Sequence, residues 1–452
     1  MIEITINNEK NAYNVYHLVK AFYPQEEIRS VVDEKASHFV KIISRDLELV
    51  FTEMPRSTLD KELYLALAQQ TKRTLPWGLL LGIRPTKLAY QRLSAGDREE
   101  RVINWLEKEK YVSADKAKLC VGIALKERTL LSKLAKDKGY SLFVSIPICP
   151  TICNYCSFSS GDLRRYEDRL DTYVKTLIKE LRAVSSKVKD QPLNTIYIGG
   201  GTPTVLPPRL LERLLGEIHD LFPARQVLEY TVEAGRPDAI DEEKLRLLKT
   251  YQVNRISINP QSMNQETLRL IGRAHTVEQI RESFTLARSL GFDNINMDII
   301  AGFSNEKLAD FDYTLAEIKK LQPNSLTVHS LAIKRAARLN EIKISADVVQ
   351  EMVDSAREKA SEMELFPYYL YRQKNSAGNF ENIGYSREGK ESLYNILIME
   401  ELQTIIGCGA GAITKLVDRE GKVRRVDNVK DIDTYIERID EMIDKKGELQ
   451  WF

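Results

Sequence analysis

The sequence predicts an α/β protein whose central part is a partial (β/α)6 barrel. Six short, strongly apolar runs are each followed by a longer amphipathic stretch, which is typical of a parallel sheet buried on both faces. Each run also ends in a polar or glycine-rich signature, and α/β barrels build their sites at these strand ends. Six units are too few for a closed eight-stranded barrel but suit an open one. The runs are 142–148, 195–201, 228–234, 255–261, 295–302 and 325–332.

The segments on either side of the barrel follow other patterns. Residues 1–138 predict an N-terminal α/β accessory domain, and residues 139–335 form the barrel. Residues 336–452 predict a C-terminal, mainly helical α+β region that would cover the substrate at the barrel mouth. In the N-terminal domain we expect strands over 4–8 and 39–51 and helices over 12–22, 61–71, 87–93, 98–109 and 114–136. In the C-terminal region we expect a helix over 345–364, an extended segment over 368–373, a glycine-rich turn and a helical tail.

Bulk properties exclude several classes of protein. The 66 lysine and arginine residues nearly cancel the 65 acidic ones, so charge gives no support to nucleic-acid binding. The N-terminus lacks the basic start and apolar run of a signal peptide, and the apolar stretch 75–83 is too short to span a bilayer. Three of the five cysteines lie within eight residues, unlike a secreted disulfide framework. These features predict a cytoplasmic protein with no membrane span.

A cysteine loop directly follows the first barrel strand. Cys149, Cys153 and Cys156 are spaced so that three thiolates can converge, and such sets hold zinc or an iron–sulfur cluster. A structural zinc site needs four protein ligands, yet the loop contains no histidine and Cys120 lies on a separate helical segment. Three ligands would leave one iron of a [4Fe-4S] cluster open. We interpret the loop as a cluster site, with a zinc site or three core cysteines as alternatives.

Other conspicuous residues lie at the ends of the next four strands. The second strand runs into glycines 199–201, which can bring backbone N–H groups close to a ligand carboxylate. Glu233, Gln261 and Asp298 follow on the third, fourth and fifth strands and should point into the barrel mouth. Each of them alone would more often be a cap or a core polar group. Beside a cysteine loop, together they predict a cofactor site.

The cysteine spacing resembles the signature of the radical S-adenosylmethionine (SAM) superfamily. Residues 142–414 resemble one branch, the oxygen-independent coproporphyrinogen III oxidase family, in the segments CPTICNYC, GGGTPT, VEA, PQSMNQETLRLIGRAHT, NMDIIAGF and GCGAGAIT. The N-terminal domain and the segments EAGRPD and GCGAGA resemble the HemZ-type coproporphyrinogen dehydrogenase group within that family.

The resemblance implies a [4Fe-4S] cluster and SAM as cofactors. The open iron would take the amino and carboxylate groups of SAM, and an electron from the cluster would cleave it to a 5′-deoxyadenosyl radical that abstracts a substrate hydrogen atom. No catalytic residue beyond the cluster and SAM is implied, and the backbone of Tyr155 would face the adenine. By resemblance, the residues lining SAM would be Tyr155, Gly200, Gly201, Thr202, Glu233, Gln261, Arg273, Asp298, Ala332 and Ile413.

The family implies oxidative decarboxylation of two propionates of coproporphyrinogen III to vinyl groups, giving protoporphyrinogen IX. The characterised oxidases begin the first strand with Tyr-x-His and carry a fourth cysteine, positions that are Phe143, Ser145 and Phe158 here. The haem-chaperone branch carries His-Asn-x-x-Tyr-Trp where this chain has residues 394–399, YNILIM. A haem-binding chaperone and another radical reaction on a tetrapyrrole are the alternative functions.

The implied partners are a tetrapyrrole and a low-potential electron donor such as flavodoxin or ferredoxin. A group of tyrosines and a group of arginines suit a flat substrate with carboxylates. Core packing explains the tyrosines equally well, and a solvated face explains the arginines equally well. His329 and Cys408 are more often structural than functional in such positions. The two groups are tyrosines Tyr368, Tyr369, Tyr371, Tyr385 and Tyr394, and arginines Arg335, Arg338, Arg372 and Arg387.

Overall fold

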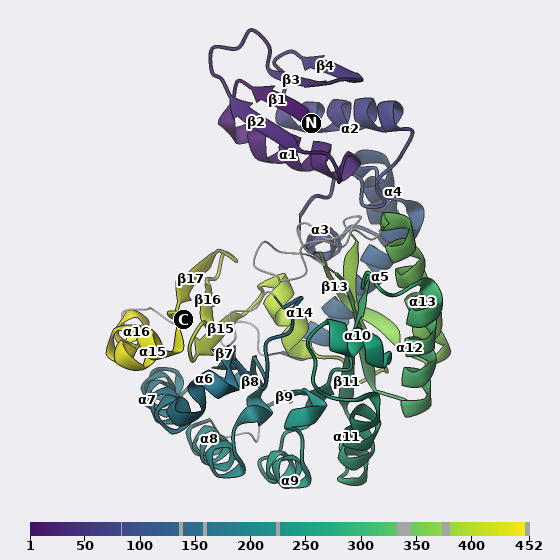
Figure 1. Ribbon diagram of the computed structural model, residues 1–452. Coiled ribbons are helices and arrows are strands. Elements are labelled where there is room, and N and C mark those ends of the chain that lie inside the picture. The colour runs from purple at the N-terminus through teal and green to yellow at the C-terminus, as the bar shows by residue number, and fades with distance from the viewer. Residues whose placement is uncertain are drawn as a thin grey trace. The chain divides into compact units, whose positions relative to one another are not determined.

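The computed structural model describes residues 1–82, 84–134, 139–156, 161–222, 227–331, 345–372 and 380–447 (Figure 1). The chain divides into two compact units. The first comprises Met1–Arg128 and Leu370–Glu381, and the second comprises Thr129–Tyr369 and Asn382–Phe452. The division into three domains that we expected from the sequence stays a prediction.

The first unit begins with a four-stranded sheet in the order β2-β1-β3-β4. Strands β1 (Ile2–Ile6) and β2 (Ile28–Val32) are parallel, while β3 (Val40–Ser44) and β4 (Leu47–Phe51) form an antiparallel hairpin. Alternate residues of β1 are buried because they face helices α1 (Glu9–Phe22) and α2 (Arg56–Thr71). Strand β2 was not expected, because almost all of its side chains are exposed and it lacks the apolar alternation of a strand.

Three further helices complete the first unit, namely α3 (Pro85–Ser94), α4 (Glu99–Lys110) and most of α5 (Ala114–Leu131). A buried ion pair ties the segment 370–381 to them. Lys116 on α5 pairs with Glu381, and the indole Nε1 of Trp77 donates to the same carboxylate at 2.8 Å. The charge of Glu381 is thus compensated inside the fold, as a buried carboxylate requires.

The second unit is built on six parallel strands that follow one another in chain order across the sheet, which confirms the predicted partial (β/α)6 barrel. Their apolar residues are buried on both faces, as the near-continuous apolar runs predicted. The strands are β5 (Tyr140–Ile146), β8 (Leu193–Gly200), β9 (Glu229–Gly235), β10 (Arg255–Ile258), β11 (Ile295–Ala301) and β12 (Ser325–Ser330).

Helices connect successive strands and cover the outside of the barrel (Figure 1). They begin where the sequence supplies capping groups: Asp241 caps α9, and Thr276 with Gln279 forms a capping box on α11. The helices are α6 (Leu163–Tyr166), α7 (Leu170–Val188), α8 (Pro208–Leu221), α9 (Glu242–Thr250), α10 (Gln265–Leu270), α11 (Val277–Ser289), α12 (Leu308–Leu321) and α13 (Ala346–Glu362).

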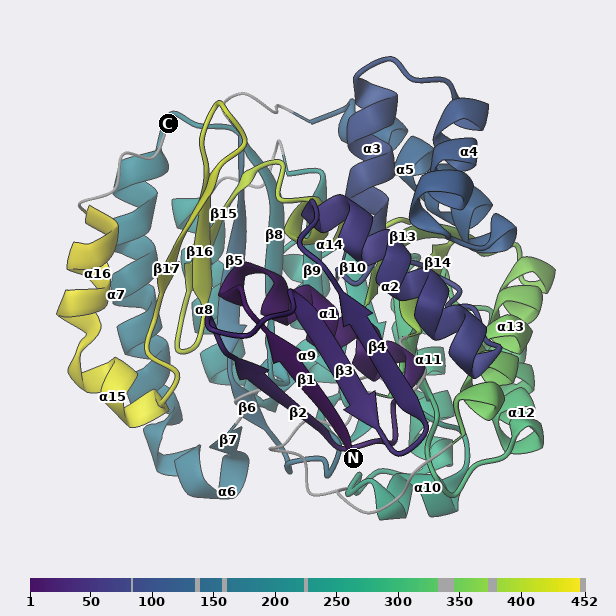
Figure 2. The same ribbon diagram turned by 90° about the horizontal axis from the view of Figure 1, so that it is seen from above.

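The C-terminal segment extends this sheet at both edges. Strand β15 (Thr404–Cys408) adds in parallel to β5. Strand β16 (Ile413–Val417) pairs antiparallel with β15, and β17 (Val423–Asp427) pairs antiparallel with β16 (Figure 2). Strand β14 (Glu381–Ser386) pairs with β12, and β13 (Phe366–Arg372) lies beyond it. The glycine-rich region that we expected as a turn therefore contains strands. The remaining helices are α14 (Leu393–Glu400), α15 (Ile432–Glu437) and α16 (Ile439–Gly447).

A buried glutamate on α7 holds the glycine-rich segment 407–411 against the barrel. Glu180 accepts hydrogen bonds from Gly409 N at 2.7 Å, Asn428 Nδ2 at 2.9 Å and the Tyr435 hydroxyl at 2.6 Å, and it pairs with Lys446 of α16. Every partner comes from a different part of the C-terminal segment. The Glu180 carboxylate therefore connects the added strand β15 and the helices α15 and α16 to α7.

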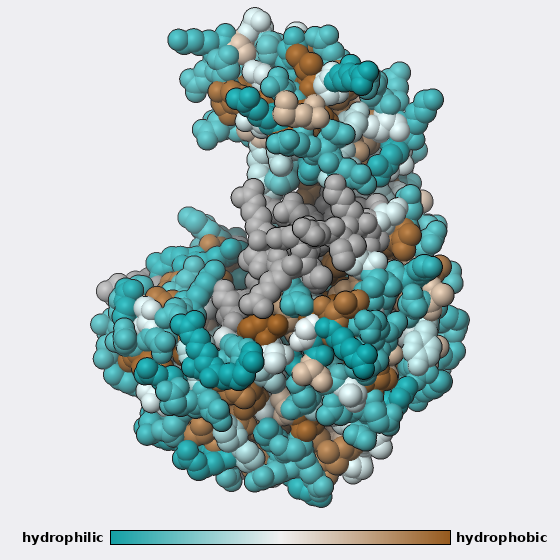
Figure 3. Space-filling model, in the orientation of Figure 1, coloured by the Kyte–Doolittle hydropathy of each residue, from teal (hydrophilic) through white to brown (hydrophobic). Residues whose placement is uncertain are grey.

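The face of the molecule in Figure 3 is mostly hydrophilic, with hydrophobic residues in small separate patches. Among the helices that the structure describes, none combines the length with the apolar character that a bilayer span demands.

Candidate active site

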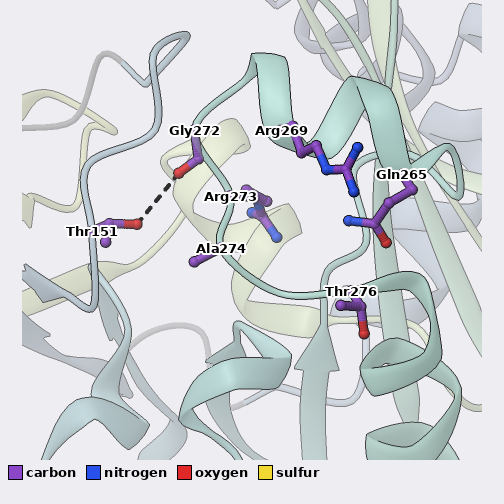
Figure 4. Close-up of a pocket in the computed structure, with 7 residues that line it drawn as sticks. All are labelled: Thr151, Gln265, Arg269, Gly272, Arg273, Ala274 and Thr276. Carbon is purple, nitrogen blue, oxygen red and sulfur yellow. Dashed lines mark hydrogen bonds between the residues drawn. The ribbon is translucent and has the colours of Figure 1, made fainter.

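The cysteine loop, residues 149–156, begins at the short strand β6 (Ile148–Cys149) and lies against the turn that follows α10. Asn154 N donates to the carbonyl of Ile271 at 2.9 Å, and its Nδ2 donates to the carbonyl of Leu270 at 2.9 Å. The Thr151 hydroxyl donates to the carbonyl of Gly272 at 3.3 Å (Figure 4). These bonds fix the loop between its cysteines. The three cysteines of the loop are partly exposed and are not joined in disulfides.

A pocket of about 590 Å³ adjoins this contact. Arg269 and Gln265 extend from α10 on one side of the segment that carries Gly272 and Ala274, and Thr151 of the cysteine loop lies on the other side (Figure 4). The pocket thus places solvent-accessible polar groups next to the cysteine loop. Its lining residues are Thr151, Gln265, Arg269, Gly272, Arg273, Ala274 and Thr276.

Hydrogen-bond donors surround two of the three thiols. The Thr202 hydroxyl lies 3.5 Å from the sulfur of Cys149, and Arg236 Nη1 lies 3.8 Å from the sulfur of Cys153. Hydrogen-bond donors and positive charge beside cysteine sulfurs are typical of iron–sulfur sites, so this donor set fits a cluster. Within the described ranges, no three His, Cys, Asp or Glu side chains converge as one metal ion would require.

The glycine run at the end of β8 contacts the backbone that leads into the cysteine loop. Gly201 N donates to the carbonyl of Ile146 at 2.9 Å, and Thr202 N donates to the carbonyl of Ile148 at 2.8 Å. A Cβ at Gly201 would lie 2.7 Å from backbone atoms of Ile148, so only glycine permits this approach. The N–H of Gly201, one of the glycines expected to bring N–H groups to a ligand carboxylate, and the N–H of Thr202 therefore already donate to backbone carbonyls.

Glu233 lies on β9 next to this run and is hydrogen-bonded by the Tyr197 hydroxyl of β8. Burial raises the pKa of the Glu233 carboxyl to about 7, and the negative charge of Asp298 adds to the rise. Hydrogen bonds from Tyr197 and the Gly200 backbone act in the opposite direction. A carboxylate in this position would be stabilised by a cationic group such as the amino group of SAM.

We expect Glu233→Gln to remove a pH dependence from the stability of the SAM-free protein. A carboxyl whose pKa rises on folding, here from 4.5 to about 7, stabilises the fold below pH 4.5 and loses that contribution as the pH rises through 7. The variant should therefore gain stability relative to wild type between pH 4.5 and 8, by at most about 3 kcal/mol. Denaturant unfolding at a series of pH values measures this difference.

The exposed Glu243→Gln on α9 is the matched control and should show no such trend. A difference between Glu233→Gln and wild type that stays constant over this pH range would contradict a raised pKa in the folded protein.

Gln261 and Asp298 are joined through the backbone at the ends of β10 and β11. Gln261 has a left-handed φ of 66°, and its N–H donates to the carbonyl of Asp298 at 2.9 Å. The Asp298 carboxylate accepts from Asn296 Nδ2 at 2.7 Å and lies 3.8 Å from His329 Nε2. Burial alone would raise the pKa of Asp298, but hydrogen bonds and the charge of His329 lower it overall. Asp298 is thus predisposed to remain negative, whereas Glu233 is poised to change its charge.

Arg273 connects the fourth strand end to the cysteine loop. Its Nη1 donates to the carbonyl of Asn259 and its Nη2 to the Tyr155 hydroxyl at 3.2 Å, while the Tyr155 ring meets Phe303 edge to face. The Nε of Arg273 is buried and has no hydrogen-bond partner in the described part of the chain. A buried guanidinium with a spare donor suits a polar ligand.

The remaining expected SAM residues are Ile413 and Ala332. Ile413 lies on β16, and its side chain is 40% exposed. Ala332 lies outside the described residues, as do Phe158, Arg335 and Arg338.

Most of the tyrosines considered for a substrate wall are core residues: Tyr368, Tyr369, Tyr385 and Tyr394 are all buried. Cys408 is fully buried in β15, which fits a packing role. Arg372 is buried and donates to the carbonyl of Leu80 within the first unit.

Sequence reasoning missed two residues of the site. Tyr197, which holds Glu233, also stacks on Tyr394 with ring centroids 4.2 Å apart, and Tyr394 stacks on Phe143. The alternation of β8 could have indicated Tyr197, because Tyr197 and Gly199 lie on the same face of that strand. Arg236 directly follows β9. A charged residue before a proline at the end of a buried strand could have indicated it as a site residue.

Comparison with known proteins identifies the class first. The model of the radical SAM superfamily matches residues 143–318, which include the cysteine loop and most of the barrel. The match defines the protein as a radical SAM enzyme, and the superfamily's cofactors, a [4Fe-4S] cluster and SAM, are those predicted.

The relatives then identify the family. The oxygen-independent coproporphyrinogen-III oxidase-like protein HemZ of Bacillus subtilis (strain 168) is 43% identical over 394 residues, covering 85% of this chain and 79% of the relative. The heme chaperone HemW of the same organism is 29% identical over 274 residues, covering 60% of this chain and 70% of the relative. The chain belongs to the family of oxygen-independent coproporphyrinogen-III oxidase-like proteins.

The fold agrees with this assignment. The coproporphyrinogen III oxidase HemN from Escherichia coli superposes with a TM-score of 0.56 at 22% identity, covering 70% of this chain and 73% of that chain.

Proposed function

We propose that the protein carries out oxidative decarboxylation of the propionates of coproporphyrinogen III to vinyl groups, giving protoporphyrinogen IX for haem biosynthesis in the cytoplasm. The observation that carries this proposal is the 43% identity with the oxidase-like HemZ over 85% of the chain. The chaperone HemW is more distant, at 29% identity over 60%.

We propose that Cys149, Cys153 and Cys156 hold the cluster, as the donors around Cys149 and Cys153 support. When bound, the cluster and SAM would supply a radical that removes one hydrogen atom from each propionate. The propionate would then lose CO2 and pass one electron to an acceptor. A low-potential donor such as flavodoxin or ferredoxin would reduce the cluster.

The chain's own residues would bind and orient SAM. Glu233, held by Tyr197, and Asp298, held by Asn296, offer two acidic groups for the amino and hydroxyl groups of SAM. Arg273 would keep Tyr155 and the cysteine loop in register with the fourth strand. Gly200, with φ of 100°, and Gly201 would let the second strand closely approach the backbone that leads into the cysteine loop. Gln261 would keep the Asp298 backbone in place.

The substrate contacts must differ from those of oxidases with Tyr-x-His in the first strand. Ser145 is buried, and its hydroxyl donates to the carbonyl of Ala410 at 2.8 Å. Phe143 is packed beside Tyr197 and Tyr394. Other residues must therefore bind the propionates.

Anaerobic reconstitution with iron and sulfide, followed by dithionite, SAM and coproporphyrinogen III, tests the function. Chromatography should show 5′-deoxyadenosine together with a monovinyl tripropionate intermediate and protoporphyrinogen IX. Formation of 5′-deoxyadenosine without either tetrapyrrole product would refute the oxidase function and leave another radical reaction. Tight stoichiometric haem binding that Cys149→Ala does not change would instead indicate haem delivery.

A further inference from the structure

Arg236 links the end of β9 to the middle of the cysteine loop. Its side chain is buried, and Nη1 donates to the Thr151 hydroxyl at 2.9 Å and to the Thr151 carbonyl at 3.2 Å. The same nitrogen lies 3.8 Å from the sulfur of Cys153. One guanidinium edge thus binds both the backbone of the loop and one of its thiols.

The opposite edge of the guanidinium is held by Asp238. Arg236 Nε and Nη2 donate to the two carboxylate oxygens at 2.9 and 2.6 Å, a bidentate geometry that fixes the plane of the guanidinium. His275 Nδ1 lies 3.8 Å from the same carboxylate and is fully buried. Burial alone would raise the pKa of Asp238, but the nearby His275 and the hydrogen bonds from Arg236 hold it well below its ordinary value.

The segment also leaves Arg236 little freedom to move. Its N–H donates to the carbonyl of Ala234 at 2.6 Å, and its carbonyl accepts from Ala239 N at 2.9 Å. Pro237 begins the single turn Pro237–Ala239 that carries Asp238. The charge beside Cys153 is therefore built into the barrel rather than supplied by a mobile surface side chain.

We propose that Arg236, held in place by Asp238, is a positioning residue that raises the reduction potential of the cluster through its donor and charge at Cys153. Reduction adds negative charge to a cluster, and hydrogen bonds and positive charge at its cysteine sulfurs stabilise the reduced state. The proposal rests on the assignment of the cluster to the three cysteines and does not depend on the identity of the tetrapyrrole.

Potentiometric titration of the reconstituted protein, followed by electron paramagnetic resonance, tests the proposal. Arg236→Gln removes the donor and charge at the sulfur, so we expect the equilibrium constant for one-electron reduction to fall about tenfold, which is about 59 mV. Arg236→Lys retains the positive charge but lacks the planar guanidinium that binds both Asp238 and the loop. Its reduction potential should lie between those of Arg236→Gln and wild type. Arg246→Gln, an exposed arginine paired with Glu242 on α9, is the control and should titrate like wild type.

A second variant separates tuning from folding. Arg236→Gln leaves the partly exposed Asp238 carboxylate without its bidentate partner, whereas the double variant Arg236→Gln with Asp238→Asn removes both charges. A wild-type potential in either variant at full iron and sulfide content would overturn the proposal. Loss of the cluster from both variants, with Arg236→Lys at the wild-type potential, would also overturn it and leave only a role in holding the loop.

Product analysis on the same samples separates this proposal from the proposed function. A lowered potential in Arg236→Gln with no porphyrin product from wild type would support the tuning and refute the oxidase activity. Unchanged potentials in the Arg236 variants, together with normal product formation by wild type, would refute the tuning and support the oxidase activity.

Discussion

Replacing Cys153 with alanine is expected to abolish both cluster binding and SAM cleavage. Cluster irons are held by cysteine thiolates, and the loop supplies only three, so the variant would retain two. Arg236 Nη1 lies 3.8 Å from this sulfur, so the variant also removes one of the acceptors of that guanidinium. Iron and sulfide analysis after anaerobic reconstitution, with chromatography of 5′-deoxyadenosine, measures the two losses.

Cys408→Ala is the matched control, because it removes a fully buried thiol from β15 at a cost of about 1 kcal/mol. It should bind iron and cleave SAM like wild type. Wild-type iron content and SAM cleavage in Cys153→Ala would show that this cysteine is not a cluster ligand.

Gly201→Ala is expected to reduce SAM cleavage by about 100-fold or more. The added Cβ would lie 2.7 Å from Ile148 N and O and 2.8 Å from the Ile146 carbonyl oxygen, all of them backbone atoms that cannot rotate away. Relief requires the backbone that enters the cysteine loop to move, and a shift of about 1 Å at a reacting centre costs about 10²-fold in rate. Anaerobic single-turnover assays of 5′-deoxyadenosine formation measure this effect.

Gly122→Ala within α5 is the control, because nothing lies within 4 Å of its added Cβ. Alanine is favoured over glycine in a helix by about 1 kcal/mol, so this variant should be at least as stable as wild type. If Gly201→Ala cleaved SAM at the wild-type rate, the close approach of β8 to the cysteine loop would not be needed for the reaction.

The limits of sequence reasoning follow from the kinds of interaction involved. Buried strands β5 and β8 to β12 were predictable because burial on both faces demands continuous apolar residues. Strand β2 lies at an edge and is exposed, and β15 contains the glycine of a close backbone contact, so neither carries that pattern. Their pairing depends on partners distant in the chain, namely β1 and β5.

The site shows the same contrast. The cysteine spacing is a local property of the loop, which is why it indicated cluster chemistry without a structure. The contact between Arg236 and Cys153 joins residues 83 positions apart, and the bond between Tyr197 and Glu233 joins neighbouring strands. No local pattern encodes such pairs, because they depend on strand register.

The sequence by itself determined the barrel, the three thiols after its first strand and the family to which the chain belongs. These depend on periodicity and spacing, which the chain carries without being folded. Only the tertiary structure decided that Gly201 and Thr202 bind the backbone that leads into the cysteine loop, that burial raises the pKa of Glu233 to about 7, and that Arg236 lies at Cys153. Burial and register exist only when the strands are assembled, and these properties arise from them.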